Sequence, residues 1–253
     1  MLVLALDTST PSVTAGVVRL RRPHEIIAAL EAGAVLGDEA SRPGALLGEQ
    51  SVTDPYAHAE RLMPLALAAL AEAGHGLHEL DAVVVGLGPG PFTGLRVGIA
   101  TAAALGDGLG IGVHGVPSHD GTARALEPLP GPLLVVTDAR RREVYLSAYS
   151  ADGGRTFGPL VVAPAAAPQL LAEHDLAPAF VTGAGSPLLD PFRSSTFAPA
   201  TLESADASTS LGLVERAAVA LLTGVVPGPL TPLYLRRPDA TEPGTRRKSV
   251  LGR

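Results

Sequence analysis

The apolar segments of this chain recur in one order along its length, and that order constrains the fold more than any other feature. Short apolar runs of strand length alternate with longer stretches that carry apolar residues at helical spacing. Because a strand–strand–strand–helix–strand–helix order occurs twice, the sequence predicts two α/β domains of similar plan, joined near residue 116. The expected strands are 2–6, 13–20, 46–52, 82–87, 112–116, 133–137, 143–149, 160–163 and 179–182, and the expected helices are 54–73, 92–109, 118–126, 167–174 and 208–223.

Two stretches do not follow this alternation. Between the second and third strands, 26–36 is apolar and 37–44 is loop-like, and we assign no element there. Pro64 interrupts the first long helix, where we expect a kink or a later helix start. The last residues, 238–253, are polar and basic without apolar periodicity, which is typical of a disordered tail.

The composition excludes several classes of protein. Apolar residues make up 46 % of the chain, but the most apolar run, 97–113, contains Asp107 and repeated glycines and is too short to span a membrane. No basic segment precedes an apolar stretch at the start, so we expect a soluble, cytoplasmic protein without a secretory signal. The absence of cysteine excludes disulfides, thiolate metal sites and cysteine nucleophiles.

The charged residues narrow the function further. Lys248 is the only lysine and lies in the polar tail, which argues against a Walker-type phosphate lysine or a Schiff base. The formal net charge is −6, so any role with nucleic acid is expected to be shared with a partner.

The first candidate site is Asp7-Thr8-Ser9-Thr10, directly after the first expected strand. A carboxylate at a strand tip, followed by hydroxyls and backbone N–H groups, can hold Mg²⁺ and phosphate oxygens. The same residues also form ordinary Asx turns between strands, and local sequence does not decide between the two.

The second candidate is the glycine-rich segment 86–98 between a strand and a helix. It is neither a Walker A loop nor a complete dinucleotide fingerprint, since Thr93 stands at the place of the third glycine. Gly94, Gly98, Ala102 and Gly106 recur every four residues. This spacing favours close helix packing, either within the chain or against a partner.

The remaining polar clusters carry weaker signals. His75 and His78 lie in a glycine-rich turn, where a surface loop is favoured over a metal site, and no His-Glu-x-x-His or Gly-x-Ser-x-Gly motif occurs. The segment 138–145 could hold an anion through its three arginines, although local sequence favours a charged hairpin turn.

Several segments, taken together and in order, resemble the TsaB (YeaZ) family of bacterial proteins. The most specific is the string Gly-Pro-Gly-Pro-Phe-Thr-Gly-Leu-Arg-Val-Gly at 88–98. The others are Leu-Ala-Leu-Asp-Thr-Ser-Thr at 4–10, His-Ala-Glu-Arg-Leu-Met-Pro at 58–64, Asp-Ala-Arg at 138–140 with Glu-Val-Tyr at 143–145, and Pro-Leu-Tyr-Leu-Arg at 232–236.

The resemblance implies a fold of two tandem ribonuclease-H-like domains, as in the class of actin, sugar kinases and Hsp70, with a first domain at 1–116 and a second at 117–237. It also implies a non-catalytic subunit that binds and activates TsaD, the transferase that makes threonylcarbamoyladenosine in ANN-decoding tRNAs. The ATPase TsaE joins that assembly, and TsaB forms a homodimer when alone. The chain itself would need no cofactor, since ATP and magnesium belong to partner subunits, and it would meet tRNA only indirectly.

Carried over by position, the resemblance makes the helices from His58 and from Phe92 the partner-binding elements. It makes Asp7 to Thr10 a vestigial phosphate loop, with no catalytic and no metal-ligating residues. The expected interface residues are His58, Leu62, Met63, Leu65, Thr93, Gly94, Val97, Gly98, Thr101, Ala102 and Leu105.

Two rival functions stay open at this point. One is an ATP-dependent phosphotransferase or ATPase of the same fold that uses Asp7 with Mg²⁺. The other is a metallopeptidase, for which the sequence supplies no metal-ligand set, since only His58 stands where TsaD has paired histidines.

Overall fold

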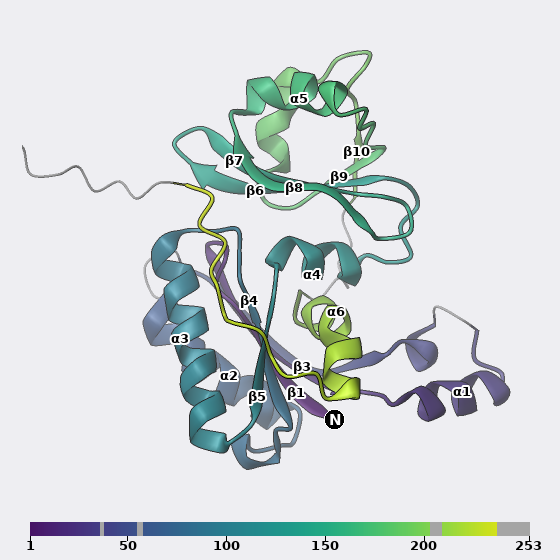
Figure 1. The fold of residues 1–253 in the computed structure, drawn as a ribbon, viewed down its shortest axis with the longest axis vertical. Coiled ribbons are helices and arrows are strands. Elements are labelled where there is room, and N and C mark those ends of the chain that lie inside the picture. Colours follow the sequence, from purple (N-terminus) through teal and green to yellow (C-terminus); the bar gives the residue numbers. More distant parts are fainter. Residues whose placement is uncertain (36–37, 55–57, 203–208, 237–253) are drawn as a thin grey trace, which may run out of the picture.

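The computed structural model describes residues 1–35, 38–54, 58–202 and 209–236 (Figure 1). It contains two sheets, one above the other, with helices around and between them. Among the described residues, no helix is both long and apolar enough to cross a lipid bilayer.

The first sheet has the strand order β3-β2-β1-β4-β5. Its first three strands are antiparallel neighbours, and β4 and β5 then add in parallel to β1. The antiparallel pairing of β1 and β2 confirms the predicted hairpin. The strands are β1 (Leu2–Asp7), β2 (Ser12–Leu20), β3 (Gly44–Thr53), β4 (Ala82–Gly86) and β5 (Gly112–Val116).

The second sheet repeats this plan with the order β10-β9-β6-β7-β8. Its first three strands are again antiparallel, and β9 and β10 again add in parallel on the other side of the first strand. Two sheets of this plan in series are two tandem ribonuclease-H-like domains, as expected. The strands are β6 (Leu133–Arg140), β7 (Glu143–Tyr149), β8 (Arg155–Val162), β9 (Phe180–Thr182) and β10 (Ala200–Thr201).

Alternation along β1 explains how the first sheet is covered. Leu4 and Leu6 point to the face that α2 (His58–Glu72) and α3 (Phe92–Leu109) cover, and Val3 and Ala5 point to the face that α6 (Thr209–Thr223) covers. Successive residues of a strand face opposite sides, so a strand buried on both sides is apolar throughout. β1 accordingly has no exposed residue.

The position of α6 corrects the predicted division at residue 116. The prediction assigned 117–237 to the second domain, but α6 packs its buried face, including Leu213, Val214 and Leu221, against the first sheet. Its buried Glu215 receives hydrogen bonds from Arg42 at 2.8 and 3.1 Å and from the backbone N–H of Gly44 at 3.1 Å. The chain therefore returns to its first half after completing the second sheet.

The second sheet is covered more lightly. The short helix α5 (Ala167–Glu173) and a 3₁₀ helix at Ser186–Phe192 pack over one face. α4 (Ser118–Ala125) lies between the two sheets and contacts both α6 and β6 (Figure 1). These contacts make α4 the joint between the two halves.

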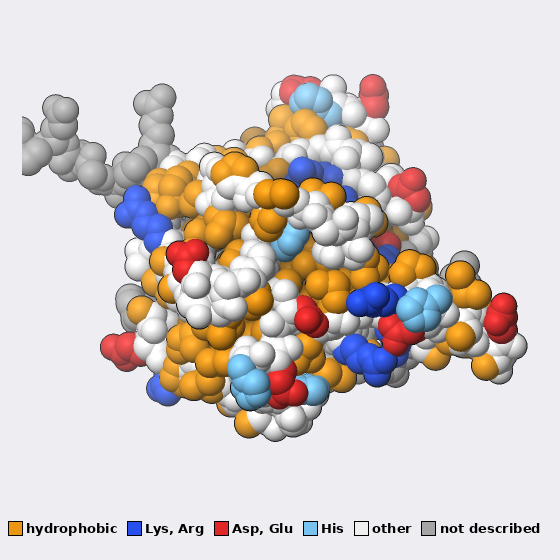
Figure 2. Space-filling view, turned by 60° about the horizontal axis from the view of Figure 1, so that its bottom comes forward, with side chains coloured by type: hydrophobic (Ala, Val, Ile, Leu, Met, Phe, Trp, Pro, Cys, Tyr) orange, Lys and Arg blue, Asp and Glu red, His pale blue; other side chains and the backbone are white. Residues whose placement is uncertain are grey.

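Several predicted boundaries hold and others move. The helix 92–109 and the strand 112–116 are observed as predicted. The helix expected from 54 begins at His58, residues 55–57 lie outside the described residues, and Pro64 lies inside the helix instead of starting it. The unassigned stretch contains α1 (Pro23–Glu31), which projects from the body and buries none of its residues (Figure 1 and Figure 2). The predicted tail 238–253 lies outside the described residues.

Candidate functional site

The turn between β1 and β2 carries the first predicted site. Asp7 Oδ1 accepts a hydrogen bond from the backbone N–H of Ser9 at 2.7 Å. The hydroxyl of Thr10 lies 3.2 Å from both the backbone N–H and the carbonyl oxygen of Ser12. This pattern is the Asx turn that the sequence left open as an alternative.

Asp7 is nevertheless an unusual turn residue, because its side chain is buried. It is 6 % exposed, and Oδ2 has no hydrogen-bond partner among the described residues. Burial raises the pKa of the Asp7 carboxyl, against the opposite effects of the Ser9 bonds and the nearby hydroxyl of Ser118. A buried carboxylate oxygen without a hydrogen-bond partner destabilises the fold. Such an atom therefore calls for an explanation, either a functional role or a bound water or ion.

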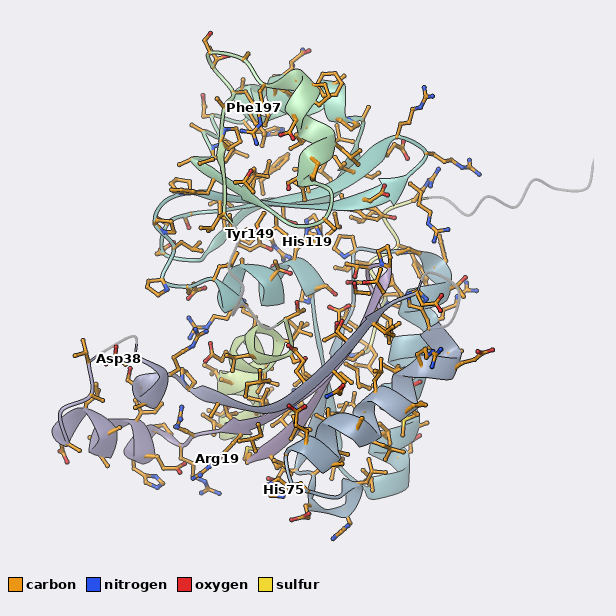
Figure 3. The ribbon with its side chains drawn as sticks, turned by 180° about the vertical axis from the view of Figure 1, so that it is seen from behind. Arg19, Asp38, His75, His119, Tyr149 and Phe197 are labelled. Atoms are coloured by element: carbon orange, nitrogen blue, oxygen red, sulfur yellow. The ribbon has the colours of Figure 1, made fainter. Side chains whose placement is uncertain are left out.

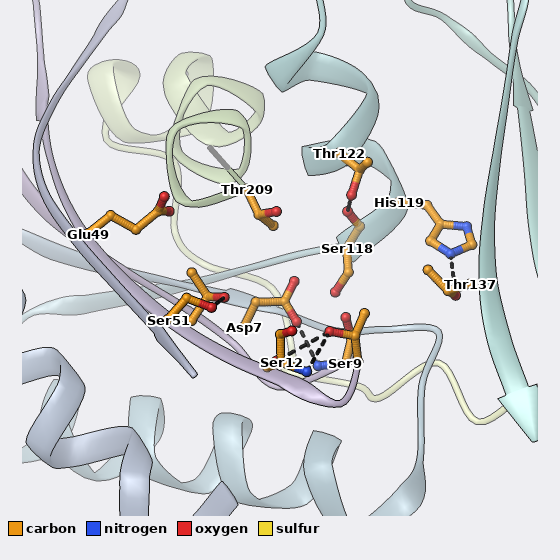
Figure 4. A pocket seen from close by; sticks show the side chains of 12 residues that line it. Asp7, Ser9, Ser12, Glu49, Ser51, Ser118, His119, Thr122, Thr137 and Thr209 are labelled. Atoms are coloured by element: carbon orange, nitrogen blue, oxygen red, sulfur yellow. Dashed lines mark hydrogen bonds between the residues drawn. The ribbon is translucent and has the colours of Figure 1, made fainter. Parts of the chain in front are cut away.

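Asp7 borders a cavity of about 300 Å³ between the two halves of the molecule (Figure 4). The lining combines the first sheet, α4, the start of α6 and Thr137 of the second sheet, and most of it consists of hydroxyl groups. The two carboxylates are Asp7 and Glu49, and no lysine or arginine belongs to the lining in the described part of the chain. The lining residues are Asp7, Ser9, Thr10, Ser12, Thr14, Glu49, Ser51, Ser118, His119, Thr122, Thr137 and Thr209.

The rival phosphotransferase or ATPase function would require ATP and Mg²⁺ to bind at this turn. The backbone N–H of Ser9 is bound to Asp7, and the hydroxyl of Thr8 is turned away to the carbonyl of Gly94. A phosphate would meet two carboxylates and no cationic side chain. No group of three or more acidic or histidine side chains within the described residues could hold a metal ion. At this turn a phosphate would therefore find neither the Ser9 N–H nor the Thr8 hydroxyl free, and no cationic side chain among the described lining residues.

The segments that carry the family resemblance converge on this turn. Nε2 of His58, the first residue of α2, lies 3.0 Å from the carbonyl oxygen of Thr10. The Thr8 hydroxyl donates to the Gly94 carbonyl at 2.7 Å. A Cβ at Gly94 would lie 2.3 Å from the carbonyl oxygen of Thr8, and one at Gly98 would lie 2.3 Å from its hydroxyl. Three distant motifs thus hold one another in place.

This packing corrects part of the predicted partner interface. His58, Leu62, Gly94, Gly98 and Ala102 are buried inside the chain, so they do not form an exposed surface. The four-residue spacing of small side chains on α3 serves, at Gly94 and Gly98, close contact with Thr8. The intramolecular alternative that the sequence left open is therefore the observed one at these positions.

The other predicted interface residues lie nearer the surface. Thr93 is exposed, and Met63, Leu65, Val97, Thr101 and Leu105 are half-buried. Sequence reasoning missed Leu67, which is 49 % exposed on the outer side of α2. The signal was present, because Leu67 falls outside the stripe of Leu62, Ala66, Ala69 and Leu70 that packs inward.

On α3 the outer side is small and uncharged over several turns. Ala100 and Ala104 are exposed, and no charged residue separates Arg96 from Asp107. Because α2 and α3 pack side by side on the same sheet face, their outer sides form one surface. We call the exposed Leu67, Ala100 and Ala104 the outer face of α2 and α3.

A neutral histidine joins α4 to the second sheet at the far side of the cavity. Nδ1 of His119 lies 2.9 Å from the Ser147 hydroxyl, and Nε2 lies 2.9 Å from the Thr137 hydroxyl. Burial lowers the pKa of His119 to about 3. Next to it, the Tyr149 hydroxyl donates to Asp120 at 2.8 Å, and both His119 and Tyr149 lie between α4 and the second sheet (Figure 3). These contacts fix the joint between the halves and leave no ring nitrogen of His119 free to react.

The other two sequence candidates lie at the surface of the molecule. His75 lies 3.1 Å from Glu79 and forms no metal cluster with His78 within the described residues. The arginines at 140–142 form the exposed tip of the β6–β7 hairpin.

Comparison with known proteins agrees with this geometry. An uncharacterized protein of Mycobacterium tuberculosis is 46 % identical over 239 residues, which span 94 % of this chain and 93 % of that protein. The tRNA threonylcarbamoyladenosine biosynthesis protein TsaB of Escherichia coli is 34 % identical over 100 residues, which span 39 % of this chain and 43 % of that protein. The chain belongs to the TsaB family.

Two further comparisons extend the family assignment. The structure of YeaZ from Pseudomonas aeruginosa superposes with a TM-score of 0.65 at 24 % identity, over 92 % of this chain and 99 % of that chain, which shows the shared fold. The family model described as TsaD, tRNA N6-adenosine threonylcarbamoyltransferase, matches residues 55–179. This chain thus shares with the transferase family a similar stretch of sequence that includes α2 and continues into the second sheet.

Proposed function

We propose that this chain is a non-catalytic, cytoplasmic subunit of the machinery that makes threonylcarbamoyladenosine in tRNA. In this proposal it binds TsaD through the outer face of α2 and α3 and holds TsaD in its active state. TsaE joins the assembled complex, and the same face pairs two copies of the chain when TsaD is absent.

The observation that carries the proposal is the contrast between the cavity and the outer face. The cavity lies at the turn after the first strand, but the Thr8 hydroxyl and the Ser9 N–H are bound to Gly94 and Asp7, and the two charged side chains of its lining are acidic. The outer face presents Leu67 at 49 % exposure beside small uncharged residues. A surface of this kind permits close approach of a partner helix.

The proposed mechanism is conformational. A subunit that binds the active state of a transferase more tightly than its inactive state shifts the population toward the active state. The rigid packing of α2 and α3 against the first sheet suits this role, because the docking surface is then already formed before binding.

Binding of the full chain to the cognate TsaD, measured by calorimetry, tests the proposal. Leu67→Arg should weaken binding at least tenfold, because a charge would be buried at the centre of the interface. Val219→Arg is the matched control, since Val219 is 76 % exposed on α6 at the opposite face of the sheet. Equal affinities for the two variants would contradict the proposed interface, and no binding by the unmodified chain would contradict the proposed function.

A further inference from the structure

The tip of the β6–β7 hairpin consists of three consecutive arginines in an unusual backbone conformation. Arg140, Arg141 and Arg142 have φ angles of 61°, 50° and 62°. Arg141 and Arg142 are the two central residues of the turn, because Arg140 pairs with Glu143 across the hairpin. Positive φ at both central positions normally selects Asn-Gly, since the left-handed region is costly for residues with long side chains.

Turn formation therefore does not explain why arginine stands at these positions. A residue kept in a backbone conformation that its side chain disfavours is a candidate for a functional role. All three arginines are exposed at the tip of the hairpin. Their side chains consequently add charge to the surface without packing in a core.

A fourth arginine extends the basic surface toward the first half. Nη1 of Arg236 donates to the carbonyl oxygen of Ala139 at 3.1 Å, and its Nε lies 3.5 Å from Glu143. We call Arg140, Arg141, Arg142 and Arg236 the arginine turn.

The acidic groups of the turn are already engaged. Asp138 Oδ1 accepts the backbone N–H of Arg140 at 2.7 Å, and Glu143 faces Arg236. Among the described residues of this turn, four arginines lie beside two carboxylates, in a chain whose formal net charge is −6. The local charge at this surface is positive, whereas the net charge of the protein is negative, and this favours an anionic partner here.

One aromatic residue, Tyr234, lies two residues before Arg236 along the chain. The rings of Tyr234 and Phe92 stack with centroids 4.1 Å apart, and the guanidinium of Arg96 lies 5.5 and 5.8 Å from their centroids. Arg96 also donates to the Tyr234 hydroxyl at 3.1 Å. A fifth arginine is thereby fixed near the same edge, since Tyr234 is two residues from Arg236.

We propose that the arginine turn binds the phosphate backbone of RNA. Guanidinium groups bind phosphate oxygens with paired donors, and their planar shape costs less entropy per hydrogen bond than a lysine ammonium does. The choice of RNA among anionic partners rests on the proposed function in tRNA modification. The expectation from net charge and family, that the chain meets tRNA only indirectly, is replaced by direct contact at this one surface.

The double variant Arg141→Asn/Arg142→Gly tests this inference because it should separate stability from binding. It introduces the residues that the turn conformation favours, so the melting temperature should be equal to or above that of the unmodified chain. Binding of tRNA to the full chain, alone and with TsaD, is measured against salt concentration. Loss of two phosphate contacts should weaken binding and reduce the slope of log K against log salt by about 1.4 to 1.8.

The control Arg22→Gln/Arg216→Gln removes the same charge from two exposed positions elsewhere and should leave the slope unchanged. Unchanged affinity and slope in the double variant would overturn the inference, and so would an equal loss in the control, which would indicate charge acting at a distance. Loss of TsaD binding with RNA binding intact would assign the turn to an acidic protein surface. Failure of the unmodified chain to bind TsaD would contradict the proposed function separately, because RNA binding is also measured on the chain alone.

Discussion

The β1–β2 turn and the β6–β7 turn occupy the same place in two sheets of the same plan, yet they differ in burial and in charge. Each begins with an aspartate whose Oδ1 accepts the backbone N–H two residues later at 2.7 Å, from Ser9 in one and from Arg140 in the other. The first turn continues with hydroxyl residues and is largely buried, whereas the second continues with arginines and is exposed.

The difference comes from what surrounds each turn. α2 and α3 hold the first turn through His58, Gly94 and Gly98, so its donors are used internally. In the described part of the chain no helix covers the tip of the second turn in this way. Equal topology therefore does not give equal function, and the packing of neighbouring elements decides which turn can meet a ligand.

The largest effect on stability should come from the ion pairs that Glu215 of α6 forms with Arg42 and Arg124. Glu215→Ala leaves Arg42 and Arg124 facing a buried site without their carboxylate, and should lower the free energy of unfolding by about 3–5 kcal/mol. In the second half, Asp190→Ala breaks an exposed pair with Arg193 and should cost less than about 1 kcal/mol. Urea unfolding of both variants measures the contrast, and similar losses would show that the halves do not differ in this respect.

A smaller effect should follow from filling the space beneath the first turn. A Cβ at Gly94 would overlap the Thr8 carbonyl oxygen, so Gly94→Ala should destabilise the chain by roughly 1–3 kcal/mol. Gly108→Ala on the same helix meets open space and should be neutral or stabilise the chain by up to about 1 kcal/mol. Thermal unfolding compares the two variants. Equal melting temperatures would show that close packing of α3 against the first turn does not contribute to stability.

The aspartates of the two turns provide the smallest and most specific comparison. Asp7→Asn removes a buried, unpartnered charge and should stabilise the chain by about 1 kcal/mol at pH 7, whereas exposed Asp138→Asn should change stability by less than about 0.5 kcal/mol.

The pH dependence of this difference checks its cause. The folded-state pKa of Asp7 is raised above its usual 3.8. The loss of stability caused by the buried charge is therefore complete at pH values above the raised pKa, and it disappears as the pH falls through the raised pKa toward 3.8. The stability curves of Asp7→Asn and the unmodified chain should therefore converge in acid. Parallel curves would mean that charge burial is not the reason for the difference.

The sequence predicted local structure well because local rules determine it. The helix at 92–109 has its bounds set by proline before it and glycine after it, and both hairpins follow from apolar runs around turn residues. These are properties of neighbouring residues.

Contacts between distant residues could not be predicted in the same way. The apolar stripe of α6 shows that one side is buried, but it does not say which of two sheets covers it. The glycine spacing of α3 indicates a close approach, but Thr8, which fills that space, lies 86 residues from Gly94. Several of the expected partner residues coincide with these internal contacts, because burial inside a chain and burial at an interface select the same small and apolar residues.

Reconstituted threonylcarbamoylation of tRNA, with the cognate TsaD, TsaE and the enzyme that supplies the activated threonylcarbamoyl group, tests the central claim most directly. Product is measured without this chain, with the unmodified chain, and with the Asp7→Asn and Leu67→Arg variants. We expect product only when the chain is present, full activity with Asp7→Asn, and loss of activity with Leu67→Arg. Full activity with Leu67→Arg together with loss in a folded Asp7→Asn variant would contradict the account, because the cavity and not the outer face would then carry the function.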